Sequence, residues 1–234
     1  MAAKADTQKK NEELGINERI TEFIQKNRRV FLIGFITVVV VLVGFIVFNT
    51  VRGNIQAKAL TQVDTFERKY EELKTYIGSD EVEAVFRQVE IMLLLSELEI
   101  FTNKTSGFAA ARAHCIKADI YSGQKNWASA EEAWAKAAQA AGNSYLAPFS
   151  VYNAAVAAEE QGNVEAAIDY YTKALNYGDS FPSAVRAQFS LGRLEESRNN
   201  NDAAIDAYRQ LLSKWPNDPV WPNLAQSRIL VLSN

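Results

Sequence analysis

The segment NVEAAIDYYTKAL, residues 163–175, is one of three similar segments in the second half of the chain. The others are NWASAEEAWAKAA at 126–138 and NDAAIDAYRQLL at 201–212. Each contains a small residue, at a constant spacing of 37 positions: Ala130, Ala167 and Ala204. An aromatic residue follows four positions later in each: Trp134, Tyr171 and Tyr208. This repetition predicts stacked helical hairpins, because small residues let two helices approach closely and an aromatic fills the gap to the next hairpin.

A second set of small residues lies twelve positions upstream of the first set, at Ala118, Ala155 and Gly192. Together the three units, at about residues 108–216, resemble the tetratricopeptide repeat (TPR), in which each unit is a pair of helices. The family's period is about 34 residues. We therefore expect extra residues in the connections between units, at 142–148 and 177–183. The resemblance implies a solenoid fold, and a fold of this kind has many functions.

Composition supports a helical chain, since Ala is abundant and Gly, Pro and β-branched residues are sparse after Arg52. The predicted fold class is all-α: a single N-terminal transmembrane helix followed by an α-solenoid of TPR-like helix hairpins. Residues 53–234 carry 17 basic and 23 acidic side chains. We expect no nucleic-acid partner, because binding to phosphates requires a basic face.

The run VFLIGFITVVVVLVGFIVF, from Val30 to Phe48, contains no charged residue. A helix of this length spans roughly 30 Å of hydrocarbon. Lys26, Arg28 and Arg29 precede it, so the positive-inside rule predicts a cytoplasmic N-terminus and an external C-terminal domain. A cleaved signal peptide is the alternative. We favour an uncleaved anchor, because the apolar run and the segment before it are both longer than in a typical signal.

The chain is predicted to have four parts. Residues 1–29 form a cytoplasmic tail with a short amphipathic helix, which either lies on the inner leaflet or docks a partner. Residues 30–51 form the transmembrane helix. Residues 52–104 form a membrane-proximal helical hairpin, and its second helix is so apolar that we expect it to be covered on most faces. Residues 105–234 form the TPR-like repeats with a C-terminal closing helix.

Two smaller features of the repeat region also have structural interpretations. We expect Leu230 and Val231 of the closing helix to belong to the core, with an oligomer contact as the alternative. The acidic pairs at 131–132, 159–160 and 195–196 are interpreted as solvated helix faces.

No sequence motif indicates catalysis. The chain has no HExxH, P-loop, GxGxxG or Gly-x-Ser-x-Gly pattern. Cys115 and His114 are the only residues of their types, and each is interpreted as structural. We therefore expect no enzyme activity, no cofactor and no metal.

The TPR resemblance implies an inner wall built from the first helix of each unit. Its candidate peptide-binding residues are Phe149, Tyr152, Val156, Arg186, Phe189 and Arg193. Further wall positions are Arg112, Cys115, Asp119, Ser122, Glu159 and Glu196. Aromatic side chains supply rigid contact area, and arginines bind carboxylates. An alternative stays open, in which Phe149, Tyr152 and Phe189 pack between the hairpins.

Two further segments, INERITEFIQKNRRVFLIGF at 16–35 and SRILVLSN at 227–234, resemble the YfgM-like family of bacterial inner-membrane proteins. Members of that family are ancillary subunits of the Sec translocon with a periplasmic TPR domain. The resemblance implies a single-pass protein of the bacterial inner membrane that acts as an adaptor in the periplasm. Its implied partners are the Sec translocon, periplasmic chaperones or nascent clients. The alternative function is a scaffold subunit of a larger envelope machine, such as a secretion apparatus or a flagellar-motor collar.

Overall fold

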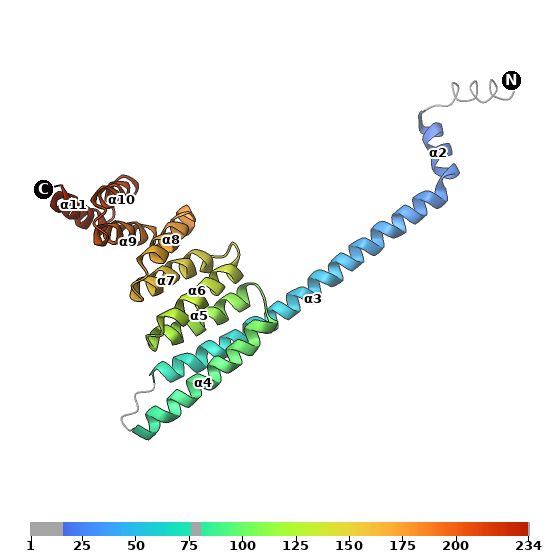
Figure 1. Cartoon of the computed structure of the whole chain (residues 1–234). Coiled ribbons are helices and arrows are strands. Elements are labelled where there is room, and N and C mark those ends of the chain that lie inside the picture. The colour runs from blue at the N-terminus through green and yellow to red at the C-terminus, as the bar shows by residue number, and fades with distance from the viewer. Residues whose placement is uncertain (1–15, 76–80, 234) are drawn as a thin grey trace. The chain divides into compact units, whose positions relative to one another are not determined.

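A computed structural model describes residues 16–75 and 81–233, and all regular secondary structure in these ranges is helical. The predicted all-α fold with a TPR-like solenoid is confirmed (Figure 1). The chain divides into two compact units, residues 1–57 and 58–234. The helices are α2 (Ile16–Lys26), α3 (Arg28–Thr75), α4 (Glu81–Lys104), α5 (Phe108–Gly123), α6 (Trp127–Ala141), α7 (Leu146–Glu160), α8 (Val164–Leu175), the short 3-10 helix η1 (Gly178–Ser180), α9 (Ala184–Ser197), α10 (Asn201–Lys214) and α11 (Trp221–Leu232).

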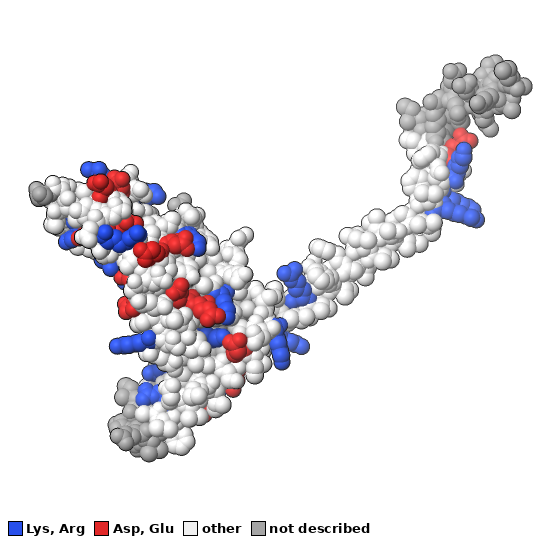
Figure 2. All heavy atoms as spheres, in the orientation of Figure 1, with Lys and Arg blue, Asp and Glu red and all other residues white. Residues whose placement is uncertain are grey.

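The first unit contains α2 and the apolar part of α3. Every large apolar side chain from Val30 to Phe48 is exposed. The visible face of this stretch has no charged side chain, and basic groups lie at both of its ends (Figure 2). The hydroxyl of Thr37 donates to the carbonyl of Ile33 at 2.9 Å, so this polar group is bonded within the helix. Such internal pairing is what a helix surrounded by hydrocarbon requires.

The second unit begins with a pair of packed helices. Val63, Phe66 and Tyr70 of α3 are buried in a cluster with residues of α4 and α5. The rings of Phe66 and Phe101 meet edge to face, with centroids 5.5 Å apart. One prediction is wrong here: α4 is buried on one face only, and a broad apolar face of the same helix is exposed.

Three hairpins follow, α5/α6, α7/α8 and α9/α10, each with the packing that the repeat predicts. The six small residues of the pattern are buried, as are the three aromatics that follow them. The closest approach is at Gly192, where a Cβ atom would lie 2.4 Å from Cε1 of Tyr208. Side-chain caps start two of the second helices: Asn126 accepts from the Ser129 amide at 3.3 Å, and Asn163 from the Ala166 amide at 3.2 Å.

The extra residues of the 37-residue period are accommodated in two ways. Between α8 and α9 they form a long connection, residues 176–183, that includes η1. Between α6 and α7 the connection is only 142–145, because α7 already begins at Leu146 and includes Pro148 in its first turn. Proline is tolerated there, since a first-turn amide has no partner within the helix.

The closing helix α11 covers the end of the solenoid through Ala225, which is buried against Tyr208 and Leu211. Just before this helix, the carboxylate of Asp218 accepts from the amides of Val220 and Trp221, both at 3.0 Å. The expectation that Leu230 and Val231 belong to the core is wrong, since they are 59% and 58% exposed.

Candidate functional site

The candidate groove residues come from two first helices. Phe149, Tyr152 and Val156 lie on α7, and Arg186, Phe189 and Arg193 lie on α9. The structure places them in three different local environments, so they differ in what they can offer a ligand.

Phe149 is the exposed aromatic of the set. Its ring is 47% exposed and meets the buried Trp134 of α6 edge to face, with centroids 5.5 Å apart. The contact with Trp134 therefore limits the rotation of the Phe149 ring. An exposed aromatic held in one orientation loses little entropy when it contacts a ligand.

Tyr152 and Val156 are half-buried and belong to the core cluster around α8. The ring of Tyr152 lies 5.5 Å from that of Tyr171 and 5.7 Å from that of Phe181. Burial raises the pKa of Tyr152, so its hydroxyl stays protonated and can donate a hydrogen bond. Much of each side chain is thus engaged in packing, with one side left accessible.

Phe189 is half-buried, like Tyr152, and packs against aromatic residues of two other helices. Its ring lies 5.3 Å from that of Tyr208 and 5.1 Å from that of Trp221, so it joins α9 to both α10 and α11. For this residue the packing alternative describes the structure better than the groove interpretation. Arg186 is exposed on the same helix, one turn before it.

Arg193 is also exposed, and its guanidinium binds Glu159 of the preceding unit at 2.5 Å. The same carboxylate accepts a hydrogen bond from the buried Tyr171 at 3.2 Å. A ligand that binds Arg193 therefore competes with Glu159 for its donors.

The next unit repeats this arrangement. Glu196 accepts from the hydroxyl of Tyr208 at 3.2 Å and also from two guanidinium nitrogens of Arg228 on α11, Nε at 3.1 Å and Nη2. The interpretation of Glu159 and Glu196 as solvated residues is wrong, because their side chains are only 26% and 20% exposed. The sequence contains a signal for this contact. Each Glu precedes its Tyr by twelve positions, and the Glu–Tyr pair recurs 37 residues later.

The first unit lacks this arrangement and is held by other contacts. Arg112 of α5 binds Asp64 at 2.6 Å and also Glu67, both on α3.

The thiol of Cys115 lies 3.6 Å from the hydroxyl of Ser150, and burial raises its pKa to about 11. Burial likewise lowers the pKa of His114 to about 4. A protonated thiol and a neutral imidazole in these positions fit the structural roles expected of them.

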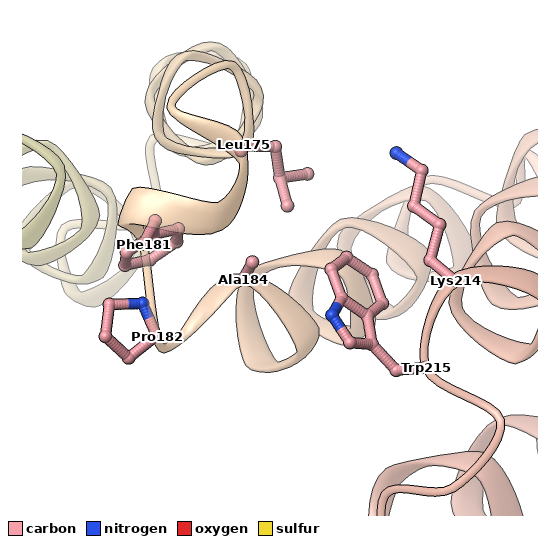
Figure 3. Close-up of a pocket in the computed structure, with 7 residues that line it drawn as sticks. Leu175, Phe181, Pro182, Ala184, Lys214 and Trp215 are labelled. Carbon is pink, nitrogen blue, oxygen red and sulfur yellow. The ribbon is translucent and has the colours of Figure 1, made fainter.

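A pocket of about 490 Å³ lies where the ends of α8 and α10 meet the start of α9. Phe181 and Pro182 lie on one side of it, and Lys214 and Trp215 on the other (Figure 3). Lys214 is the only charged side chain among the described residues that line it, and its Nζ lies 5.8 Å from the centre of the Trp215 ring. Such a lining suits an apolar side chain next to a carboxylate, and it offers neither an acid–base pair nor a nucleophile. Within the described ranges, no group of three His, Cys, Asp or Glu residues is arranged to hold a metal ion.

These features define a class: a helical repeat protein whose side chains offer surfaces for binding. The model of the tetratricopeptide repeat family matches residues 117–180 and 152–219. A TPR repeat-containing protein of Treponema pallidum (strain Nichols) is 31% identical over 231 residues, which cover 92% of this chain and 93% of that protein. The chain belongs to the family of TPR repeat-containing proteins.

The fold has a counterpart among solved structures as well. A crystal structure of nearly identical TPR-like repeats from Podosopora anserina aligns with a TM-score of 0.52 at 13% identity. The alignment covers 73% of this chain and 86% of that one. At this identity the likeness concerns the fold alone, and it agrees with the hairpins described above. TPR domains bind other proteins, so the partners of this chain are proteins.

Proposed function

We propose that this protein is a membrane-anchored TPR adaptor that binds protein partners at the outer face of a bacterial inner membrane. One observation carries the proposal: a single chain joins a TPR solenoid to a helix with 19 consecutive uncharged residues whose large apolar side chains are all exposed. Exposed apolar surface of that extent is stable in lipid and costly in water. The proposed parts are a cytoplasmic tail (1–29), a transmembrane helix (30–51), a membrane-proximal hairpin (52–104) and the repeats (105–234).

The proposed orientation follows from the basic residues Lys26, Arg28 and Arg29 at the N-terminal end of the apolar run. A tethered solenoid meets other proteins of the same membrane at a high effective concentration, so weak docking contacts are sufficient. The similarity of residues 16–35 and 227–234 to the YfgM-like family supports a finer proposal. The partners would then be the Sec translocon, periplasmic chaperones or emerging periplasmic polypeptides.

The binding surface that we propose is centred on Phe149, with Tyr152 and Val156 beside it and Arg186 on the next first helix. Phe149 is exposed and supported by Trp134. Arg186 is exposed as well, so it can reach a backbone carbonyl or a carboxylate of a bound chain. Phe189 and Arg193 contribute less, because the first is packed and the second is paired with Glu159.

A second function is favoured by those same internal contacts. The Glu–Tyr–Arg contacts of two successive units tie α7 to α9 and α9 to the closing helix α11, which suits a rigid scaffold subunit of a larger envelope machine. In that case a fixed partner would bind the outer or end surfaces of the solenoid. The side chains of the inner wall would then pack between the hairpins and bind no ligand.

Two experiments test these proposals. A reporter enzyme that folds only in the periplasm should be active when fused after Asn234, and inactive when fused after Asn27, before the apolar run. The reverse result would exclude the proposed orientation.

A photo-crosslinker at Phe149 should then capture many different polypeptides, whereas the same group at the exposed Asp169 of α8 should not. A single stoichiometric partner, captured from Asp169 alone, would establish the scaffold instead.

A further inference from the structure

Helix α4 presents an apolar stripe to the surface. Six large apolar side chains on it are between 47% and 67% exposed: Val85, Phe86, Val89, Met92, Leu93 and Ile100. At 100° per residue these positions fall within an arc of about 120° on one side of the helix. We call this set the α4 stripe.

The opposite face of α4 fixes the direction of the stripe. Leu94 and Leu98 are fully buried and Phe101 nearly so, all in the cluster with α3 and α5. The helix is therefore held by its own core, and the stripe is not one side of an unpacked segment. Six side chains of this size, about half exposed, present on the order of 500 Å² of apolar surface, which is near the upper end for a single patch on a monomer.

The spacing within the stripe matches that of a helix-binding seam. Phe86, Leu93 and Ile100 are seven residues apart, and Val85 and Met92 are seven residues apart beside them. A seven-residue repeat of apolar side chains is the pattern by which one helix packs along another. The stripe therefore fits an α-helix better than an extended peptide.

Carboxylates line both edges of the stripe. Glu90 and Glu97 lie along one edge and are both 49% exposed, while Glu99 lies along the other and is 54% exposed. On its inner side Glu97 lies 3.4 Å from Lys69, and Glu99 is bound by Lys117, so both groups are held beside the stripe. Their outer halves stay accessible to a partner.

These edge charges discriminate among possible occupants. In an antiparallel pair of two α4 helices, Glu90 of one copy would lie near Glu97 of the other, and such like-charge contacts are unfavourable. The phosphates of an anionic lipid surface would be repelled in the same way. A helix with Lys or Arg beside its apolar residues would instead meet opposite charges on both edges.

We propose that the α4 stripe is a docking surface for an amphipathic helix of another protein, with apolar side chains at heptad spacing and Lys or Arg flanking them. This surface lies on α4, whereas the proposed groove lies on α7 and α9, so one molecule can hold two partners. The two surfaces share no residue, so an experiment can disprove binding at the α4 stripe without affecting the proposal for the groove.

The direct test uses the full-length protein in nanodiscs of neutral phosphatidylcholine and two synthetic labelled peptides. Both have four heptads with the same Leu and Val seam, flanked by Lys in one and by Glu in the other. By fluorescence anisotropy the Lys-flanked peptide should bind at least tenfold more tightly, and its affinity should fall with added salt. Equal affinities, or no binding at 100 µM (roughly the weak limit for a specific helix contact), would overturn the proposal.

Variants separate the seam from its charges. Phe86→Gln/Leu93→Gln should weaken binding of the Lys-flanked peptide at least tenfold. Glu90→Gln/Glu97→Gln should at least halve its advantage over the Glu-flanked peptide, with the helical circular dichroism signal unchanged. The matched control is Leu230→Gln/Val231→Gln, which removes an exposed apolar pair on α11 and should leave binding unchanged. The proposal would be contradicted if the control variant lost binding, or if the α4 variants bound the peptide as tightly as the wild type.

A photo-crosslinker at Met92 in cells identifies the natural occupant. An adduct whose crosslinked segment is a heptad-patterned helix with flanking Lys or Arg supports the proposal. An adduct to a second copy of this chain, to lipid or to a segment without that pattern overturns it, and so does the absence of any adduct.

Discussion

The guanidinium of Arg193 lies 2.5 Å from the carboxylate of Glu159, and this ion pair joins helix α9 to helix α7. The two residues belong to successive repeat units, so the contact links one hairpin to the next. Behind it, Tyr171 donates its hydroxyl hydrogen to the same carboxylate from within the core. The carboxylate thus serves one exposed and one buried donor at the boundary between units.

Replacing Glu159 with Ala should lower the free energy of unfolding by about 1–2 kcal/mol, mainly because the buried hydroxyl of Tyr171 loses its acceptor. The ion pair itself contributes less, since Arg193 is 46% exposed. Chemical denaturation of the full chain measures the change. The control is Glu160→Ala, because Glu160 is exposed next to it and should cost less than about 0.5 kcal/mol. Equal effects of the two substitutions would argue against a role for the Glu159 contacts.

Gly192→Ala should destabilise the third hairpin by about 2 kcal/mol or more. The added Cβ would lie 2.4 Å from the ring of Tyr208, which is fully buried and has no room to move aside. Gly123→Ala is the control, since no atom lies within 4 Å of the corresponding Cβ. Thermal unfolding of both variants tests the difference. A second substitution, Tyr208→Leu, should restore part of the stability lost in Gly192→Ala if the ring is the obstacle.

The hairpins were predictable from the sequence because their determinants are local and repeated. Small residues and aromatics at a 37-residue spacing specify which helix faces meet, whatever the connections do. The exposed side of α4 was not predictable in the same way. Leu93 and Leu94 are adjacent and equally apolar, yet the first is half exposed and the second is fully buried. Only the position of the neighbouring helices decides between them.

The candidate groove shows a similar limit. Family positions select one face of α7 and one face of α9, but periodicity gives no information on which side chains neighbouring units cover. Trp221 and Tyr208 pack against the ring of Phe189, whereas Phe149 stays exposed. The pairing of Arg193 with Glu159 depends on the register between hairpins, which residue types alone do not specify.

Lys125→Gly should stabilise the protein by about 0.5–1 kcal/mol. Lys125 has a φ of 57° in the turn between α5 and α6, a conformation in which a side chain is strained. The equivalent positions one and two periods later are Gly162 and Asn199, with φ values of 76° and 60°, and both residue types tolerate this region. Gln124→Gly serves as the control, because its φ of −84° needs no glycine and the substitution should bring no gain. Urea denaturation distinguishes the two.

His114 should make stability depend on pH between about 4 and 6.5. Burial lowers its pKa to about 4, whereas the unfolded chain binds this proton near pH 6.5. Because the unfolded state then binds more protons in this window, the contribution is fully present above pH 6.5 and is lost as the pH falls. The wild type should lose about 2 kcal/mol more than His114→Gln between pH 7 and pH 5. His114 is the only histidine, so its NMR titration reads the pKa directly. A midpoint near 6.5 in the folded protein would contradict the assignment.

Phe149→Ala and Phe189→Ala should have opposite consequences for stability and binding. Phe149 is 47% exposed, so its loss should cost less than about 1 kcal/mol of stability. The yield of partner polypeptides crosslinked by a photo-crosslinker at position 186 of α9 should fall at least threefold. Phe189 lies between Tyr208 and Trp221, so its loss should cost about 2–3 kcal/mol because it leaves a cavity at the α9/α11 contact. Chemical denaturation measures the loss of stability in both variants, and the crosslinking yield measures the loss of binding. If Phe149→Ala proved the more destabilising of the two and left crosslinking unchanged, the exposed ring would be a packing residue, and the binding surface would have to lie elsewhere on the solenoid.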